Sequence, residues 1–90
     1  MRDDEFEWDD GKAASNIVKH NVSFDTARFA FEDPDHLEFD EPDPDELRYQ
    51  RICLHGLDLY VVMYTERHTR IRIISARRAS TYEQHLYENR

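Results

Sequence analysis

The stretch RYQRICLHGLDLYVVMYTERHTRIRIISA, residues 48–76, decides the fold class of this chain. It holds three runs rich in β-branched and aromatic residues, a composition that is typical of strands. The runs are roughly Arg48–His55, Leu57–Glu66 and Arg70–Ala76. Gly56 and the Arg67–Thr69 segment leave only short connections between them. Because such connections join antiparallel neighbours, the sequence predicts two successive β-hairpins.

The middle run has apolar side chains on both of its faces. Leu59, Val61 and Met63 alternate there with Tyr60, Val62 and Tyr64. Successive side chains of a strand point to opposite faces, so this pattern is typical of a central strand. Upstream, the alternating Leu37–Glu41 stretch predicts a strand at a sheet edge, and residues 42–46 predict an exposed acidic loop.

A short strand and a helix are predicted at the N-terminal end. The strand covers Phe6–Asp9, and the helix covers Lys12–His20 with Asp9 or Asp10 as its N-cap. Asn21 is expected to end this helix, because Asn tolerates a left-handed backbone better than most residues. The apolar side of the helix is expected to comprise Ala13, Ala14, Ile17 and Val18.

A second helix is predicted to start after Ser23, which suits the N-cap position, and to end at Asp33-Pro34. Its buried stripe follows helical spacing. The stripe consists of Phe24, Ala27 and Phe31.

Ser80 and Glu83 match a capping box, which predicts a C-terminal helix. The element order is then strand, two helices, four strands and a helix. This order indicates the α+β class, with two N-terminal helices packed on a mainly antiparallel four- to five-stranded sheet. Residues 1–90 are expected to form a single domain, since a second core would not fit.

Composition favours an intracellular globular protein. Hydrophobic residues make up 39% of the chain, but no run reaches the roughly 20 residues that span a bilayer. The start of the chain shows no basic and apolar export signal. The single cysteine, Cys53, excludes an internal disulfide, fits a reducing cytoplasm and is expected to be a small core residue.

The net charge of −8 hides an uneven distribution. Residues 1–46 carry sixteen acidic and four basic side chains, a balance of −12. Residues 47–90 carry four acidic and eight basic side chains, a balance of +4, and all eight are Arg. A guanidinium presents a planar fork that suits phosphate or carboxylate, so the second half favours such a ligand.

Two sets of residues resemble the BrnT family of bacterial toxins. The N-terminal set is Phe6–Asp9, Lys12, Asn16, Lys19, His20, Val22–Phe24 and Ala27. The C-terminal set is Tyr64–Glu66, Arg70–Arg77, Ala79 and Glu83. The resemblance covers nearly the whole chain and is weakest in the acidic region 32–46.

This resemblance implies a RelE-like fold and an endoribonuclease toxin that arrests translation. It also implies neutralisation by a DNA-binding, BrnA-like antitoxin, with a higher-order toxin–antitoxin complex left open. Direct DNA binding by this chain alone is not expected, because its acidic half would repel the phosphate backbone. A membrane partner is not expected either.

RNA cleavage without a metal needs a base, a cation for the phosphate charge and an acid. Arg70 and Arg72 share one face of a strand, while Ile71 and Ile73 turn to the core. Arg77 and Arg78 follow, just ahead of a helix N-terminus that also favours an anion. Arg72 and Arg77 are therefore the catalytic candidates, and Arg70 and Arg78 the substrate-binding ones. The alternative is that these arginines only solvate and protect an edge.

His20 is the first candidate for proton transfer, since imidazole titrates near neutral pH. It could equally be a helix C-cap that interacts with the last carbonyls. Lys19 could bind phosphate, act as a base if its pKa is lowered, or be a solvated lysine. Glu66 could act as a base, orient an arginine or form a surface ion pair. Glu83 is explained by its capping box alone.

No cofactor and no metal are expected. The five histidines show no ligand spacing, one cysteine cannot build a structural zinc site, and two glycines cannot build a nucleotide loop. Two hypotheses of different classes therefore remain. The chain is a ribonuclease toxin, or it is a non-catalytic or degenerate module whose arginine face binds an antitoxin or another acidic partner.

Overall fold

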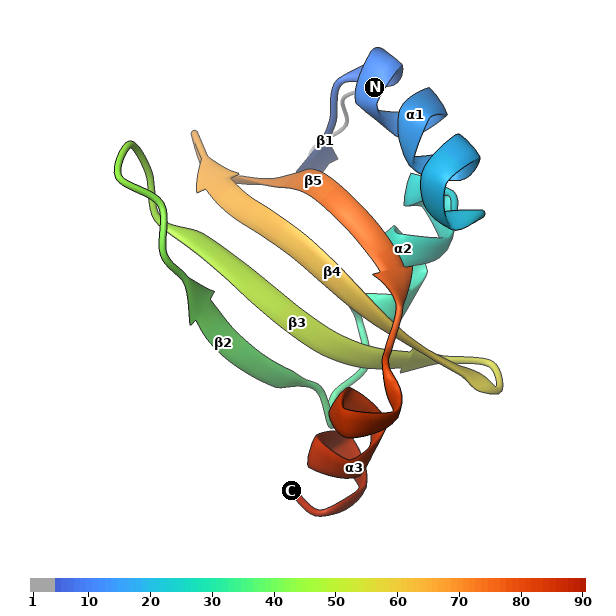
Figure 1. Cartoon of the computed structure of the whole chain (residues 1–90). Helices are drawn as coiled ribbons and strands as arrows, with labels where there is room; N and C mark the ends of the chain where they lie inside the picture. Colours follow the sequence, from blue (N-terminus) through green and yellow to red (C-terminus); the bar gives the residue numbers. More distant parts are fainter. Residues whose placement is uncertain (1–4) are drawn as a thin grey trace.

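Within residues 5–90, five strands form one sheet in the order β1-β5-β4-β3-β2 (Figure 1). The elements are β1 (Phe6–Glu7), α1 (Asp10–His20), α2 (Phe24–Ala30), β2 (Leu37–Glu41), β3 (Arg48–His55), β4 (Asp58–Arg67), β5 (Arg70–Arg78) and α3 (Thr81–Glu88). The computed structural model describes residues 5–90, so the expectation for the first four residues lies outside it.

The predicted hairpins are confirmed. β3 pairs antiparallel with β4, and β4 pairs antiparallel with β5, so β4 is the central strand. Gly56, at φ 63°, makes the first turn, and His68 and Thr69 are also left-handed in the second turn. β2 is an edge strand, as expected, and β1 pairs in parallel with β5 at the other edge.

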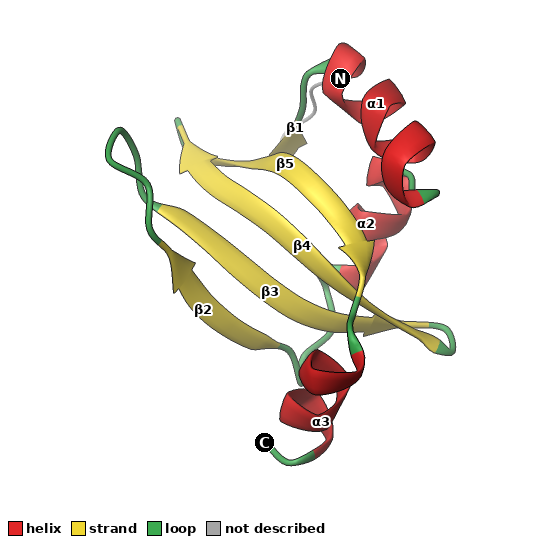
Figure 2. Cartoon of the chain, in the orientation of Figure 1, coloured by secondary structure: helices red, strands yellow, loops and turns green. Residues whose placement is uncertain are grey.

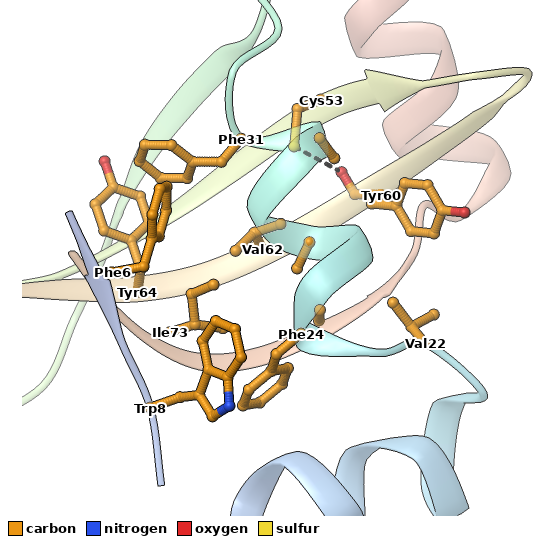
Figure 3. Close-up of a cluster of buried hydrophobic side chains, with 13 residues drawn as sticks. Phe6, Trp8, Val22, Phe24, Phe31, Cys53, Tyr60, Val62, Tyr64 and Ile73 are labelled. Atoms are coloured by element: carbon orange, nitrogen blue, oxygen red, sulfur yellow. Dashed lines mark hydrogen bonds between the residues drawn. The ribbon is translucent and has the colours of Figure 1, made fainter. Parts of the chain in front are cut away.

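One face of the sheet packs against the first two helices (Figure 2). α2 contacts β3, β4 and β5, while α1 contacts β5. Phe24, Ala27 and Phe31 are all buried, which confirms the predicted stripe. Figure 3 shows the side chains of this core gathered between α2 and the strands. They include Phe6, Trp8, Val22, Cys53, Tyr60, Val62, Tyr64 and Ile73.

The opposite face is covered only at one end, by α3 (Figure 1). Tyr87 packs there with Ile52 and Val61, which form a second, smaller buried cluster. The capping box predicted for α3 is present, since Ser80 and Glu83 each accept from the other's backbone N–H. The Tyr87 hydroxyl also donates to Asp33 at 2.7 Å, which ties α3 to the end of the α2 region.

The expected apolar side of α1 is confirmed only at Ala13, which packs against the core. Ile17 is 48% exposed and Val18 is 87% exposed, whereas Asn16 is the buried residue of the helix. The reason lies in β5, whose edge is paired by β1 only at Ile71 and Arg72. The polar backbone beyond that point needs partners, and an amide side chain supplies them where an apolar one cannot.

The first strand is also shorter than predicted. Trp8 and Asp9 lie outside β1, because Asp9 is the N-cap of α1 and accepts from the backbone N–H of Lys12 at 2.8 Å. Trp8 is buried between these elements and meets the Phe24 ring edge-on. Asn21 ends α1 in the left-handed conformation, at φ 55°, as predicted.

Candidate functional site

The sheet face opposite α1 and α2 carries three of the predicted site arginines. Antiparallel partners share a face, and β5 pairs Arg70 with Arg67, Arg72 with Thr65 and Arg77 with Val61. Val61 packs under α3, which identifies this as the face that α3 covers in part. We call the uncovered residues Gln50, Met63, Arg70, Arg72, Ser75 and Arg77 of this face the open face; Arg48, Thr65 and Arg67 lie on the same side of the sheet.

A β-bulge in β5 brings Arg72 and Arg77 to the same face. These residues are five apart, so a regular strand would point them to opposite faces. Met63 pairs with Ser75 while Tyr64 pairs with Ile73, which leaves Ile74 as an extra residue. The alternation shifts by one at Ile74, and Arg77 therefore joins Arg72 on the open face.

The same bulge moves Arg78 to the other face. Arg78 pairs with Tyr60, a residue of the core beneath α2, and its guanidinium lies 5.8 Å from the centre of that ring. It lines a cleft with Ile17 and Val22 of the N-terminal region. The structure therefore separates Arg78 from the other three predicted arginines.

Glutamates from the two ends of the described chain hold the two central arginines. Arg72 Nη1 lies 3.2 Å from Glu7 Oε2, across the parallel β1–β5 pairing. Arg77 donates from both terminal nitrogens to Glu83, at 2.7 and 2.9 Å. This pair of hydrogen bonds raises the pKa of Arg77, and it lowers the pKa of Glu83 to about 2. Both groups are therefore charged at neutral pH.

Lys19 and His20 lie beside β5, at the end of α1. They line a cleft of about 240 Å³ together with Lys12, the bulge residue Ile74 and Ser75. Ser75 belongs to the open face, between Arg72 and Arg77 in sequence. Ser75 is therefore the residue that this cleft and the open face share, and none of the arginines lines the cleft.

Asn16 holds α1 against this edge of β5. Its side-chain nitrogen donates to the carbonyls of Ala76, at 2.7 Å, and Val22, at 2.9 Å. Its side-chain oxygen accepts from the backbone N–H of Ala76 at 3.1 Å. The amide therefore takes the place of a strand partner and fixes where Lys19 and His20 stand.

Glu66 is not brought to this site. It pairs with Ile71 and therefore belongs to the face that carries α2. It is exposed near the end of β4 and lines a separate pocket with Glu46, Tyr49 and others. The geometry gives Glu66 no contact with His20 or with the arginines of the open face.

Other chemistry finds little support in residues 5–90. Burial raises the pKa of the Cys53 thiol to about 12, as expected of an inert core residue. Within that range, no three His, Cys, Asp or Glu side chains are arranged to hold a metal ion. In the same part of the chain, none of the helices has the length and apolar character needed to cross a membrane.

Sequence reasoning missed the glutamate partners and the cleft. The register of β1 against β5, which places Glu7 beside Arg72, leaves no local sequence signal. Glu83 was assigned only its capping role, although it also binds Arg77. Ser75 became a site residue only because of the bulge. The one sequence signal for the bulge is the odd spacing of Arg72 and Arg77. Two residues of one strand that are expected to act together should lie an even number of residues apart, unless a bulge shifts the alternation.

Together, the fold and the site define a small α+β protein that presents ion-paired arginines on an open sheet face. A family described as "Ribonuclease toxin, BrnT, of type II toxin-antitoxin system" matches residues 8–83. The chain therefore belongs to the BrnT family of ribonuclease toxins. A comparison with curated proteins gives no match.

Proposed function

We propose that this toxin cleaves RNA on the open face, with Arg72 and Arg77 holding the scissile phosphate. One observation carries the proposal: the bulge at Ile74 places these two residues on the same face. Two guanidinium groups there would stabilise the charge that builds up on the phosphate in the transition state. Arg70, on the same face, would bind a neighbouring phosphate.

The proposed reaction needs no metal. A base removes the proton of the ribose 2′-OH, and the 2′ oxygen attacks the adjacent phosphorus. The bond from phosphorus to the 5′ oxygen breaks, and an acid protonates the leaving oxygen. His20, in the cleft beside Ser75, is the candidate for one of these proton transfers, with Lys19 as a phosphate ligand. Glu66, on the other face, has no support as the second group.

RNA cleavage by arginine variants tests this proposal. Arg72→Ala and Arg77→Ala should each lower the cleavage rate about a hundredfold, because a charge aimed at the transition state is lost. Arg28→Ala is the matched control, since Arg28 belongs to α2 on the other side of the sheet and should keep full activity. Thermal melting checks that all three fold. Full activity in both open-face variants would remove this site from the account.

We further propose that a BrnA-like antitoxin silences the toxin by covering the open face. We also propose that the fold is RelE-like, that cleavage arrests translation in the cytoplasm, and that toxin and antitoxin assemble into a larger complex. The packing of two helices on one sheet face supports the fold assignment. The uncovered arginines support the occlusion, because acidic segments dock readily on a cationic face.

Side-chain NMR of the complex tests the occlusion. The signals of Arg70, Arg72 and Arg77 should shift and lose solvent accessibility when the antitoxin binds, whereas Arg28 should not respond. If all three open-face arginines keep their free-state signals in an inhibited complex, the antitoxin must act through a change of shape instead.

A further inference from the structure

Glu83 is more firmly anchored than the arginine it binds. Its Oε1 accepts from Arg77 Nη1 at 2.7 Å and from the backbone N–H of Ser80 at 2.8 Å. Its own backbone N–H donates to the Ser80 hydroxyl at 3.2 Å. The Glu83 side chain is 15% exposed, whereas that of Arg77 is 40% exposed. The carboxylate is therefore the fixed partner, and the guanidinium is the group whose position it sets.

The contact leaves part of the guanidinium available. Glu83 takes the two terminal nitrogens of Arg77, and Nη1 also donates to the Arg78 carbonyl at 3.3 Å. The Nε edge of Arg77 makes no hydrogen bond to any group between residues 5 and 90. A guanidinium has five N–H donors, so it can bind a carboxylate along one edge and a phosphate along the other.

Glu83 is unsuited to be the general base of the reaction. The hydrogen bonds from Arg77 and Ser80 hold its pKa at about 2. A base this weak removes a proton poorly at neutral pH, because efficient bases have a pKa near the working pH. Both of its carboxylate oxygens moreover already accept hydrogen bonds, Oε1 from Arg77 and Ser80 and Oε2 from Arg77.

We propose that Glu83 is the positioning residue of Arg77: its carboxylate, anchored at the start of α3, fixes the guanidinium so that the Nε edge faces the RNA phosphate. This rests on the proposed function of the open face. It makes α3 part of the active site through Glu83, which acts on the substrate by way of Arg77.

A double-mutant cycle tests the proposal on cleavage of a labelled mixed-sequence RNA oligonucleotide. Glu83→Gln keeps the capping box, since Gln also serves at this helix position, but removes the charge and the second acceptor oxygen. It should lower kcat roughly tenfold with little change in KM, because misplacing a catalytic group costs rate. In the Arg77→Ala background the same substitution should have no further effect. The matched control is Glu88→Gln, an exposed carboxylate of the same helix, which should retain full activity.

Each result decides a different question. Full activity of both Arg77→Ala and Arg72→Ala would overturn the proposed function itself, and full activity of Arg77→Ala alone would remove Arg77 from it. Loss of activity in Arg77→Ala with full activity in Glu83→Gln would overturn only the positioning role. Independent, multiplying losses in the double variant would also overturn it, since Glu83 would then act without Arg77. A flattened acidic limb of the pH–rate profile in Glu83→Gln would identify Glu83 as a base instead.

Discussion

Asn16 is the residue on which the placement of α1 depends. It is 4% exposed, and its side chain makes three hydrogen bonds to the backbone of Val22 and Ala76. A buried amide is stable only when its polar atoms have hydrogen-bond partners. Here the backbone groups of Val22 and Ala76 are in turn satisfied by the Asn16 amide. One residue therefore closes the edge of β5 and anchors the helix that carries Lys19 and His20.

Replacing Asn16 should be strongly destabilising. Asn16→Ala leaves the Ala76 N–H and two carbonyls without partners, so the free energy of unfolding should fall by about 2 to 3 kcal/mol. Ser15→Ala, at an exposed neighbouring position of α1, should change it by less than about 0.5 kcal/mol. Urea denaturation of both variants checks this. Equal stability of the two variants would show that the Asn16 bonds do not hold α1 in place.

The sequence could not reveal this arrangement at the residue scale. Ile17 and Val18 are the more apolar residues of α1, so burial of their side is the natural prediction. The unpaired backbone of β5, which favours Asn16 instead, exists only after the sheet has formed. Arg78 was grouped with the other arginines for a similar reason, because the extra residue Ile74 becomes visible only in the strand register.

At the scale of elements, most boundaries follow from local chemistry. β3 spans the predicted residues, and the caps Asp9, Asn21 and Ser23 all stand where their residue types suggested. β5 continues to Arg78 beyond its predicted end at Ala76. Its last residues are charged, and they stay in the strand because Tyr60 and Val61 of β4 pair with them. Tertiary pairing here overrides the local preference.

α3 is fastened by a contact that depends on pH. Tyr87 donates to Asp33, which also accepts from the backbone N–H groups of Leu54 and Asp35. Partial burial by itself would raise the pKa of Asp33. The hydrogen bonds outweigh it and hold that pKa below its ordinary value of 3.8. The charged Asp33 therefore contributes its full stabilisation of the folded state above pH 3.8. This contribution is lost as the pH falls below that value and Asp33 becomes protonated.

Tyr87→Phe tests this fastening. At pH 7 the variant should exchange the backbone amides of α3 several-fold faster than the unmodified protein, since about 1 kcal/mol of hydrogen bonding is lost. After correction for intrinsic rates, the difference should shrink at a pH far enough below 3.8 for Asp33 to become protonated. Amide hydrogen exchange with NMR detection measures both conditions. An equal difference at both pH values would mean that the Asp33 charge does not contribute.

On the scale of the whole molecule, the charge distribution and the fold support each other. The chain carries a net charge of −8, yet Arg70, Arg72 and Arg77 share one face of the sheet. Residues 1–46 have a charge balance of −12, so their acidic side chains outside that face would repel RNA there, whereas Glu7 of this segment lies on the face itself, paired with Arg72. The charge split was visible in the sequence, but its concentration on one face depends on the bulge in β5.

The location of bound RNA is the most direct test of the proposal that this toxin cleaves RNA on its open face. We would titrate the ¹⁵N-labelled protein with a short RNA whose 2′-hydroxyls are methylated, so that it binds without being cleaved. If RNA binds on the open face, we expect chemical-shift changes at Arg72, Ser75 and Arg77, and none along Phe24–Ala30 of α2. Shift changes confined to α2 or to the acidic residues 42–46 would contradict it.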